Sequence, residues 1–199
     1  MEKINKKDIR LQTKEALQDF FVSHGAPSFK GGQVYQWLWQ KGAHDFDIMT
    51  NLSLEHRNIL KSYFEIKHIN IDAEQRSSDG TIKNAVKLHD QLVVESVLIP
   101  TASRTTACVS SQVGCSLDCI FCATAALKRM RNLNADEIYD QVIAIDLQSK
   151  LYHNRPLSNI VFMGMGEPLM NYKNVIAAID KITHPEGLAM SPKRITLST

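Results

Sequence analysis

The spacing of hydrophobic residues changes twice along the chain, which predicts two structural regions with a connecting one between them. Residues 6–63 show apolar residues three or four positions apart, with one stripe over residues 16–21 that ends before Gly25 and Pro27. A third helical segment is expected to begin with Asn51 or Ser53 as its cap, because both side chains can accept a backbone N–H. This first region is therefore predicted to be helical.

Three aromatic residues lie in the second helical segment, which covers residues 33–39. Tyr35, Trp37 and Trp39 have flat rings that can stack on nucleobases. A small helical bundle also needs large apolar side chains in its interior, so we expect at least two of the three rings to lie in the core.

From residue 65 the apolar residues alternate with polar ones, the pattern of half-buried strands. Asp79-Gly80 is a hairpin signal, and apolar runs follow over residues 82–88 and 92–99. These runs predict two or three antiparallel strands, with Pro100 as a stop. Glu95 lies within the last of them, and a carboxylate in such a strand is expected to face solvent.

Beyond residue 105 short apolar runs alternate with helical patterns, which favours a parallel sheet with helical crossovers. Asn134 and Glu137 have the spacing of a capping box, and Asn171 can cap a second helix. The order is βαβαβ, with strands predicted over residues 107–110, 159–163 and 194–198.

Composition and charge place few limits on function. The 199 residues carry a net charge of +2, no apolar run of membrane-spanning length and no secretory signal at the start, so we expect a cytoplasmic protein without a membrane partner. Residues 101–133 hold four basic residues against Asp118 alone, a local excess of 4 − 1 = +3. Such a cluster is either a solvated face or a surface that meets phosphates.

Three cysteines, Cys115, Cys119 and Cys122, lie within eight residues. Iron–sulfur clusters are normally held by four thiolates, so a triplet indicates a cluster with one iron open to another ligand. A structural zinc site is the alternative, with Cys108 as its fourth ligand, and inert thiols are the third interpretation. A disulfide framework is not expected in a chain without export signals. The cluster is the interpretation that the spacing favours.

Gly164-Met165-Gly166-Glu167-Pro168 directly follows the predicted strand over residues 159–163. It is not a dinucleotide-binding fingerprint, because Leu169 stands where the third glycine belongs. Glycines at the carboxyl end of a parallel strand still allow a ligand to approach the backbone. Glu167 is then placed to receive an amino group.

The cysteine spacing, with Phe121 before the last cysteine, resembles the signature of radical S-adenosylmethionine (SAM) enzymes, in which SAM chelates the open iron. Longer stretches resemble the RlmN type of radical-SAM RNA methyltransferase, and segments 36–42 and 79–81 resemble its RNA-recognition region. The stretches that carry this resemblance are residues 108–115, 131–133, 163–171 and 196–199.

The resemblance implies methylation of carbon 2 of an adenine in 23S rRNA and in certain tRNAs, through a methylated cysteine and a 5′-deoxyadenosyl radical. It implies a 4Fe-4S cluster and SAM as cofactors and a flavodoxin-like electron donor. A related group methylates carbon 8 of the same ribosomal adenine. RNA must present the adenine unstacked for either reaction.

Individual residues match positions with known roles in that family. The resemblance implies that Glu95 accepts the ring proton and that Cys108 releases the product by forming a disulfide with the methyl-carrying cysteine. The remaining matches are the cluster ligands Cys115, Cys119 and Cys122 and the SAM-binding residues Gly166, Glu167 and Ser198.

The resemblance also implies an α/β fold with three parts. These are a helical RNA-recognition domain over residues 1–64, an antiparallel β linker over 65–100, and a radical-SAM core over 101–199. The core is expected to form the first βαβαβ portion of a partial (β/α)6 TIM-like barrel.

One departure from the family pattern concerns the methyl-carrying cysteine, which lies near the C-terminus in that family. Cys108 is the only cysteine outside the triplet and cannot serve as both carrier and resolving thiol. We therefore expect a fragment that does not complete methylation alone and that exposes an aggregation-prone sheet edge. Another radical-SAM reaction and a zinc-stabilised, non-enzymatic RNA-binding module are the alternatives.

Overall fold

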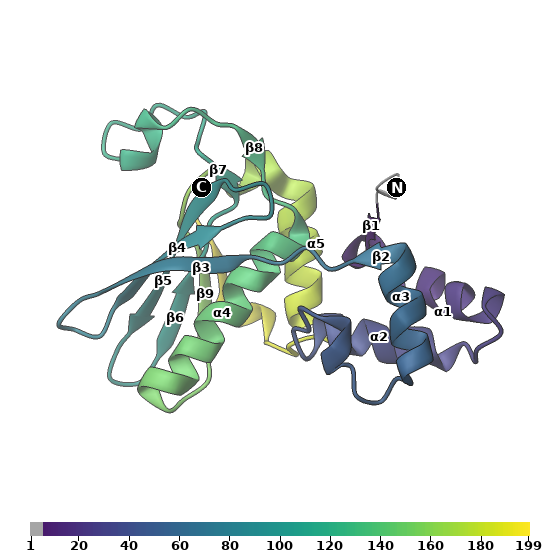
Figure 1. Ribbon diagram of the computed structural model, residues 1–199. Coiled ribbons are helices and arrows are strands. Elements are labelled where there is room, and N and C mark those ends of the chain that lie inside the picture. Colours follow the sequence, from purple (N-terminus) through teal and green to yellow (C-terminus); the bar gives the residue numbers. More distant parts are fainter. Residues whose placement is uncertain (1–5) are drawn as a thin grey trace. The chain divides into compact units, whose positions relative to one another are not determined.

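A computed structural model describes residues 6–199, which form two compact units (Figure 1). The helical unit contains residues 6–67 together with Pro185–Leu188. The sheet unit contains His68–His184 and Ala189–Thr199. The antiparallel strands that were expected to form a linker belong to the same sheet as the parallel strands.

The helical unit contains three helices and a short parallel strand pair. Thr13 caps the first helix and Ser53 the third, each accepting a backbone N–H with its side-chain oxygen, as expected for Ser53. Buried side chains of all three helices form its core, among them Leu17, Phe21, Val34, Leu38 and Leu60. The elements are β1 (Lys7–Asp8), α1 (Lys14–Ser23), α2 (Phe29–Trp39), α3 (Leu54–Tyr63) and β2 (Phe64–Glu65), with 3-10 turns at Ile9–Leu11 and Phe46–Ile48.

The expectation that two of the three α2 aromatics are core residues is wrong. Trp39 is buried, but Tyr35 and Trp37 are only half-buried. Trp37 stays near the surface because its indole N–H donates to Asn51 Oδ1 at 2.6 Å. Its ring also lies 3.8 Å from the ammonium of Lys41, a cation–π contact.

The sheet unit is built on one six-stranded sheet in the order β10-β9-β6-β5-β4-β3. Neighbouring strands from β3 to β6 are antiparallel, whereas β6, β9 and β10 are mutually parallel. The α/β class is thereby confirmed, and the antiparallel strands continue the parallel half of the sheet. The bounds are β3 (Asn70–Arg76), β4 (Ile82–Lys87), β5 (Val93–Pro100), β6 (Thr105–Cys108), β9 (Asn159–Phe162) and β10 (Ile195–Leu197).

Two helices make the crossovers between the parallel strands: α4 (Ala135–His153) and α5 (Tyr172–Thr183). The capping box of Asn134 and Glu137 is present at the start of α4, as predicted. α4 packs on β5, β6 and α5. The strand residues on the buried side alternate with more exposed ones, and this buried set includes Val94, Leu98, Ala107 and Ile160.

Shorter elements complete the sheet unit. β7 (Gln112–Val113) pairs antiparallel with β8 (Arg131–Asn132), and the segment between them, residues 115–130, is called the cysteine loop below. The 3-10 turns lie at Ala123–Ala126, Pro168–Asn171 and Pro192–Arg194. Within residues 6–199, no helix has the length and apolar character needed to cross a membrane.

Candidate functional site

The predicted site residues lie at the carboxyl ends of the three parallel strands. β6 ends at Cys108 and leads to the cysteine loop, β9 leads to Gly164–Glu167, and β10 is followed at once by Ser198. Because the strands are parallel and adjacent, these three segments leave the sheet at one edge. Ligands of open α/β sheets bind at this edge.

Backbone hydrogen bonds join the segment after β6 to the segment after β9. The N–H groups of Ser111 and Gln112 donate to the carbonyl of Met165 at 2.9 and 3.1 Å. The N–H of Met165 donates to Ser110 Oγ at 2.8 Å, and the N–H of Glu167 donates to Gln112 Oε1 at 2.9 Å. The two segments therefore form one rigid wall of the edge.

The two glycines of the Gly164–Glu167 segment are needed for this contact. A Cβ on Gly164 would lie 2.7 Å from Ser110 Oγ, and one on Gly166 would lie 2.4 Å from Gln112 Cβ. Gly166 also has a φ of +92°, which L side chains rarely adopt. The sequence alone suggested that these glycines allow a ligand to approach the backbone. The structure gives a second reason for them, the close approach of the two backbone segments.

Glu167 stands between this wall and solvent. Its Oε1 accepts the N–H of Leu169 at 3.0 Å, which caps the 3-10 turn Pro168–Asn171. The side chain is half-buried, and among residues 6–199 its Oε2 has no hydrogen-bond partner. One carboxylate oxygen thus stays available for a cationic ligand group.

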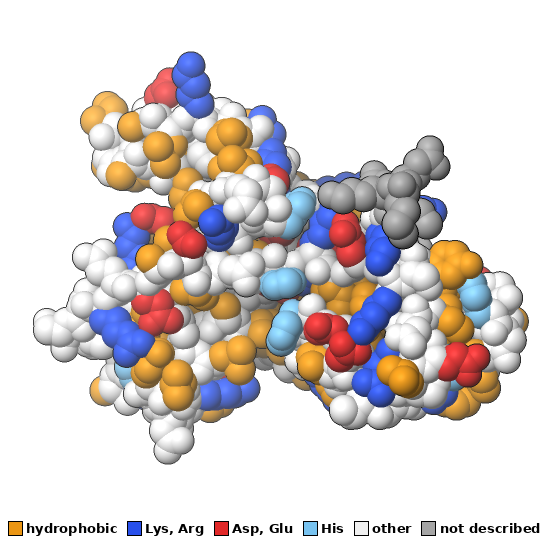
Figure 2. Space-filling model, viewed as in Figure 1, with side chains coloured by type: hydrophobic (Ala, Val, Ile, Leu, Met, Phe, Trp, Pro, Cys, Tyr) orange, Lys and Arg blue, Asp and Glu red, His pale blue; other side chains and the backbone are white. Residues whose placement is uncertain are grey.

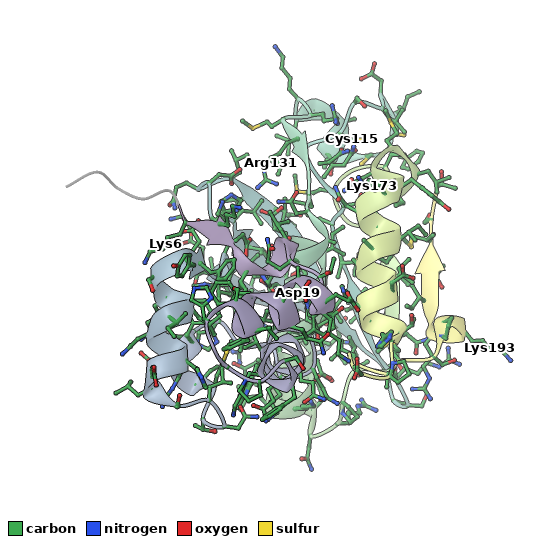
Figure 3. The ribbon with its side chains drawn as sticks, turned by 90° about the vertical axis from the view of Figure 1, so that its right-hand side faces the viewer. Lys6, Asp19, Cys115, Arg131, Lys173 and Lys193 are labelled. Carbon is green, nitrogen blue, oxygen red and sulfur yellow. The ribbon has the colours of Figure 1, made fainter. Side chains whose placement is uncertain are left out.

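The base of the cysteine loop is closed by its own backbone. The N–H of Met130 donates to the carbonyl of Val113 at 2.8 Å, and Gly114, with a φ of +72°, passes so close to Lys128 that a Cβ would lie 2.2 Å from its carbonyl oxygen. Cys115 and Arg131 lie at this base (Figure 3). The cysteine loop as a whole carries exposed hydrophobic side chains (Figure 2), namely Leu117, Ile120, Phe121, Leu127 and Met130.

Two of the three loop thiols accept hydrogen bonds from nearby residues. Backbone and side-chain hydrogen bonds from Thr124 hold the pKa of Cys122 below its usual range, and the N–H of Leu117 lies 3.4 Å from Cys115 Sγ. All three cysteines are half-buried on one loop. Three thiols of this kind match the donor chemistry of an iron–sulfur cluster.

The structure does not bring the three thiols together. Over the described part of the chain, no group of three His, Cys, Asp or Glu side chains is arranged to hold a metal ion. The three cysteines fit an iron–sulfur cluster in their chemistry and their number, but not in their present arrangement. The loop must close around the metal for all three to coordinate it.

Glu95 and Cys108 lie on the same side of neighbouring strands. Val97 is paired with Cys108 across β5 and β6, and Glu95 precedes Val97 by two residues. As expected for solvent exposure, half of the Glu95 side chain is accessible, and its carboxylate forms a 2.6 Å ion pair with Lys83. Burial raises the pKa of the Cys108 thiol, with a backbone hydrogen bond from Met163 acting in the opposite direction.

Sequence patterns did not reveal the charge network around Arg131. Its guanidinium donates two hydrogen bonds to the buried carboxylate of Glu137, at 2.7 and 2.8 Å, and a third to Asp90 at 2.6 Å. The bonds to Glu137 contribute most to the raised pKa of Arg131, and the bond to Asp90 adds to it. The bond from Arg131 in turn lowers the pKa of Asp90. Arg131 is therefore neutralised, and the predicted +3 excess overstates the charge available to phosphates.

Asn171 does not cap α5 with its side chain, contrary to expectation. Its Nδ2 instead donates to the carbonyls of Ser111 and Leu133, each at 2.8 Å, and the residue is buried. This amide links the start of α5 to the chain segments on either side of the cysteine loop. The sequence offered no signal for this role because the partners lie 60 and 38 residues away.

Comparisons with known proteins agree with the resemblance stated above. Residues 8–66 match the family model of the ribosomal RNA large subunit methyltransferase N-terminal domain, and residues 109–199 match the radical SAM superfamily. Curated relatives named probable dual-specificity RNA methyltransferase RlmN include those of Christiangramia forsetii, 75% identical over 99% of this chain, and Flavobacterium johnsoniae, 69% identical over 98%.

A solved structure, that of a radical SAM methyltransferase from Sphaerobacter thermophilus, matches with a TM-score of 0.86 and 34% identity over 97% of this chain and 57% of that one. The chain spans 56% of the length of the two curated relatives, about half of each. Both family models and the relatives agree over the described fold, and the chain is similar over nearly its whole length to RlmN-type members of the radical SAM superfamily.

Proposed function

We propose that this chain carries the cluster-binding and SAM-binding part of an RNA methyltransferase that modifies carbon 2 of adenine in 23S rRNA and tRNA. The observation that carries the proposal is the meeting of the cysteine loop, the Gly164–Glu167 segment and Ser198 at one edge of a parallel sheet. The names of the relatives supply the reaction class. β6, β9 and β10 then correspond to the first strands of a partial (β/α)6 barrel.

In this proposal the thiolates of Cys115, Cys119 and Cys122 hold a 4Fe-4S cluster. The cluster and SAM, when bound, supply a 5′-deoxyadenosyl radical, with the electron coming from a flavodoxin-like donor in the cytoplasm. The depressed pKa of Cys122 supports this assignment, since the thiolate is the form that binds iron. The exposed loop tip gives the thiols the freedom to converge.

Gly166, Glu167 and Ser198 receive SAM at the same edge. The carboxylate of Glu167 has one oxygen without a hydrogen-bond partner in residues 6–199, and it is proposed to bind the amino group of SAM. Gly166 and the wall formed with Gln112 fix the position of Glu167. Ser198 adds a hydroxyl donor and acceptor at the end of β10.

Glu95 and Cys108 act on the RNA in this proposal. The carboxylate of Glu95 takes the proton from the adenine ring, and its pairing with Lys83 keeps the base on the accessible side of β5. The thiol of Cys108 resolves the bond between protein and RNA. Its partner in that step is a second thiol outside the cluster set, which the 199 residues do not contain, so we expect no complete methylation from them alone.

The metal content of the chain after anaerobic reconstitution tests the proposal. We expect about four irons and four sulfides per chain. Cys119→Ala should lose most of this iron, whereas Cys108→Ala, the matched control, should keep it. Stoichiometric zinc that falls in both variants would overturn the proposal in favour of a zinc-stabilised RNA-binding module.

A further inference from the structure

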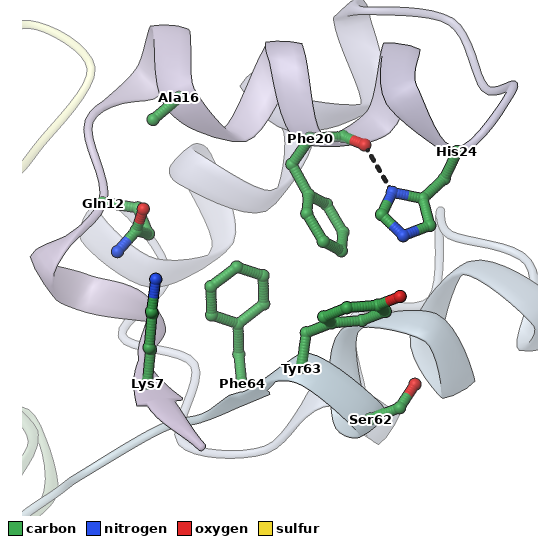
Figure 4. A pocket seen from close by; sticks show the side chains of 8 residues that line it. All are labelled: Lys7, Gln12, Ala16, Phe20, His24, Ser62, Tyr63 and Phe64. Carbon is green, nitrogen blue, oxygen red and sulfur yellow. Dashed lines mark hydrogen bonds between the residues drawn. The ribbon is translucent and has the colours of Figure 1, made fainter. Parts of the chain in front are cut away.

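The helical unit contains a pocket that the proposed reaction does not use. Its volume is about 700 Å³, within the range of ligand sites. Side chains from α1, from the residues that flank it, from α3 and from the two short strands line it (Figure 4), namely Lys7, Gln12, Ala16, Phe20, His24, Ser62, Tyr63 and Phe64. The pocket lies wholly within the helical unit.

Aromatic rings form the walls of this pocket. Phe20 makes edge-to-face contacts with Tyr63 and Phe64, at centroid distances of 5.4 and 5.0 Å, and His24 contacts Tyr63 at 5.0 Å. Phe64 is buried and Phe20 is half-buried, so both serve the core as well. Tyr63 differs from them because it is 53% exposed and so keeps accessible ring surface.

Polar groups lie at the ends of the aromatic wall. The amide of Gln12 and the ammonium of Lys7 point toward each other at one end, and His24 and Ser62 lie at the other (Figure 4). The carbonyl of Phe20 lies 2.7 Å from His24 Nδ1 and accepts a hydrogen bond from it. Among the lining residues there is no carboxylate.

These features select a flat, aromatic ligand with hydrogen-bonding edges and a negative charge beside it. An unstacked nucleobase has this form: its face stacks on an aromatic ring, its edge binds an amide, and its phosphate meets a lysine. An aliphatic peptide side chain would leave the amide and ammonium without partners. We propose that this pocket holds one unstacked base of a bound RNA, stacked on Tyr63, with Lys7 at the adjacent phosphate.

This inference rests on the proposed RNA substrate, but its test does not depend on the cluster. The full chain, without reconstitution, is titrated into a single-stranded adenosine hexamer that carries one 2-aminopurine, whose fluorescence falls when it stacks. Tyr63→Ala should weaken binding roughly 5-fold to 100-fold, the range for loss of one base–aromatic stack. Tyr63→Phe keeps the ring and should bind like the unchanged chain.

Phe29→Ala is the matched control, because Phe29 is 54% exposed in the same unit and does not line the pocket. A hexamer that lacks the base at the probe position should bind as weakly to the unchanged chain as the intact hexamer binds to Tyr63→Ala. Lys7→Gln should weaken binding of both hexamers and flatten the salt dependence.

Equal losses of affinity for Tyr63→Ala and Phe29→Ala would overturn the pocket assignment, and so would equal binding of the intact and base-free hexamers. Either result leaves the iron content of the reconstituted chain unaffected, so a failure here is separate from a failure of the proposed reaction. Unchanged quenching in Tyr63→Ala would place the base on another aromatic residue and would also reject the proposal.

Discussion

Arg131 contributes to the stability of the region that carries the site. It holds the buried Glu137, which also closes the capping box of α4, and it sits on β8 at the base of the cysteine loop. Arg131→Gln should lower the free energy of unfolding of the sheet unit by about 3 kcal/mol, because it leaves a buried carboxylate without its main partner. Urea unfolding followed by far-UV circular dichroism measures this loss.

Arg129→Gln is the control for that substitution, since Arg129 is exposed and donates a single hydrogen bond to Asn132. Its effect should stay within about 0.5 kcal/mol. Equal losses for the two variants would show that the network around Glu137 is not the source of the effect.

The same network predicts a pH dependence. Arg131 lowers the pKa of Asp90 in the folded chain. The pair therefore contributes fully to the free energy of unfolding above the pKa of Asp90 in the unfolded chain, about 3.9, and this contribution is lost as the pH falls through the lower pKa of the folded chain. The stability difference between the unchanged chain and Arg131→Gln should therefore be full at neutral pH and shrink below about pH 4. A difference that stays constant between pH 7 and pH 3 would contradict this assignment.

At the residue scale, sequence reasoning succeeds where chemistry and local spacing are sufficient. The cysteine triplet is recognised from its spacing, and the exposure of Glu95 follows from strand alternation. The roles of Asn171 and Arg131 could not be predicted, because their partners Ser111 and Asp90 become neighbours only through the fold. The same holds for Gly166, whose close contact with Gln112 joins residues 54 positions apart in sequence.

At the scale of single elements, two adjacent glycines of α2 have different surroundings. A Cβ on Gly31 would lie 2.3 Å from the backbone nitrogen of Gln18 in α1, whereas one on Gly32 would meet only the end of the Lys14 side chain at 3.7 Å. Gly31→Ala should therefore force α1 and α2 apart and destabilise the helical unit by about 2 kcal/mol. Gly32→Ala should stabilise it by about 0.5–1 kcal/mol, because alanine restricts the unfolded chain in a helical position.

Tryptophan fluorescence during urea unfolding measures both effects, because Trp37 and Trp39, the two tryptophans of the chain, lie in α2. Opposite shifts of the midpoint are the expected result. Shifts of the same sign would mean that the helix pair adapts to a methyl group at position 31 and that close packing does not decide its stability.

Most elements could be predicted because their signals are local. Helix caps such as Ser53 and Asn134, the Asp79-Gly80 turn and the alternating strands all depend on a few neighbouring residues. Strand order could not be predicted in the same way. No local sequence signal indicates that β5 pairs with β6 and so joins the antiparallel strands to the parallel ones. The same limit explains why the number of core aromatics in α2 was overestimated, since Asn51, the partner of Trp37, lies 14 residues away.

At the scale of the whole molecule, the two units have separate cores, and the unfolding of each can be followed by a different measurement. Both tryptophans belong to the helical unit, while the Arg131 network and all six strands of the main sheet belong to the other. Chains with two cores need not unfold in one step. Gly31→Ala should therefore lower the tryptophan midpoint and leave amide-exchange protection of β5, β6 and β9 unchanged.

Arg131→Gln should do the reverse: it should speed amide exchange in β5, β6 and β9 and leave the tryptophan midpoint in place. Equal responses of both signals to each substitution would show that the units unfold as one cooperative body. Independent responses would mean that the RNA pocket proposed for the helical unit can be altered without disturbing the sheet edge that carries the cysteines. Changes in RNA binding and changes in metal content could then be assigned to different parts of the same chain.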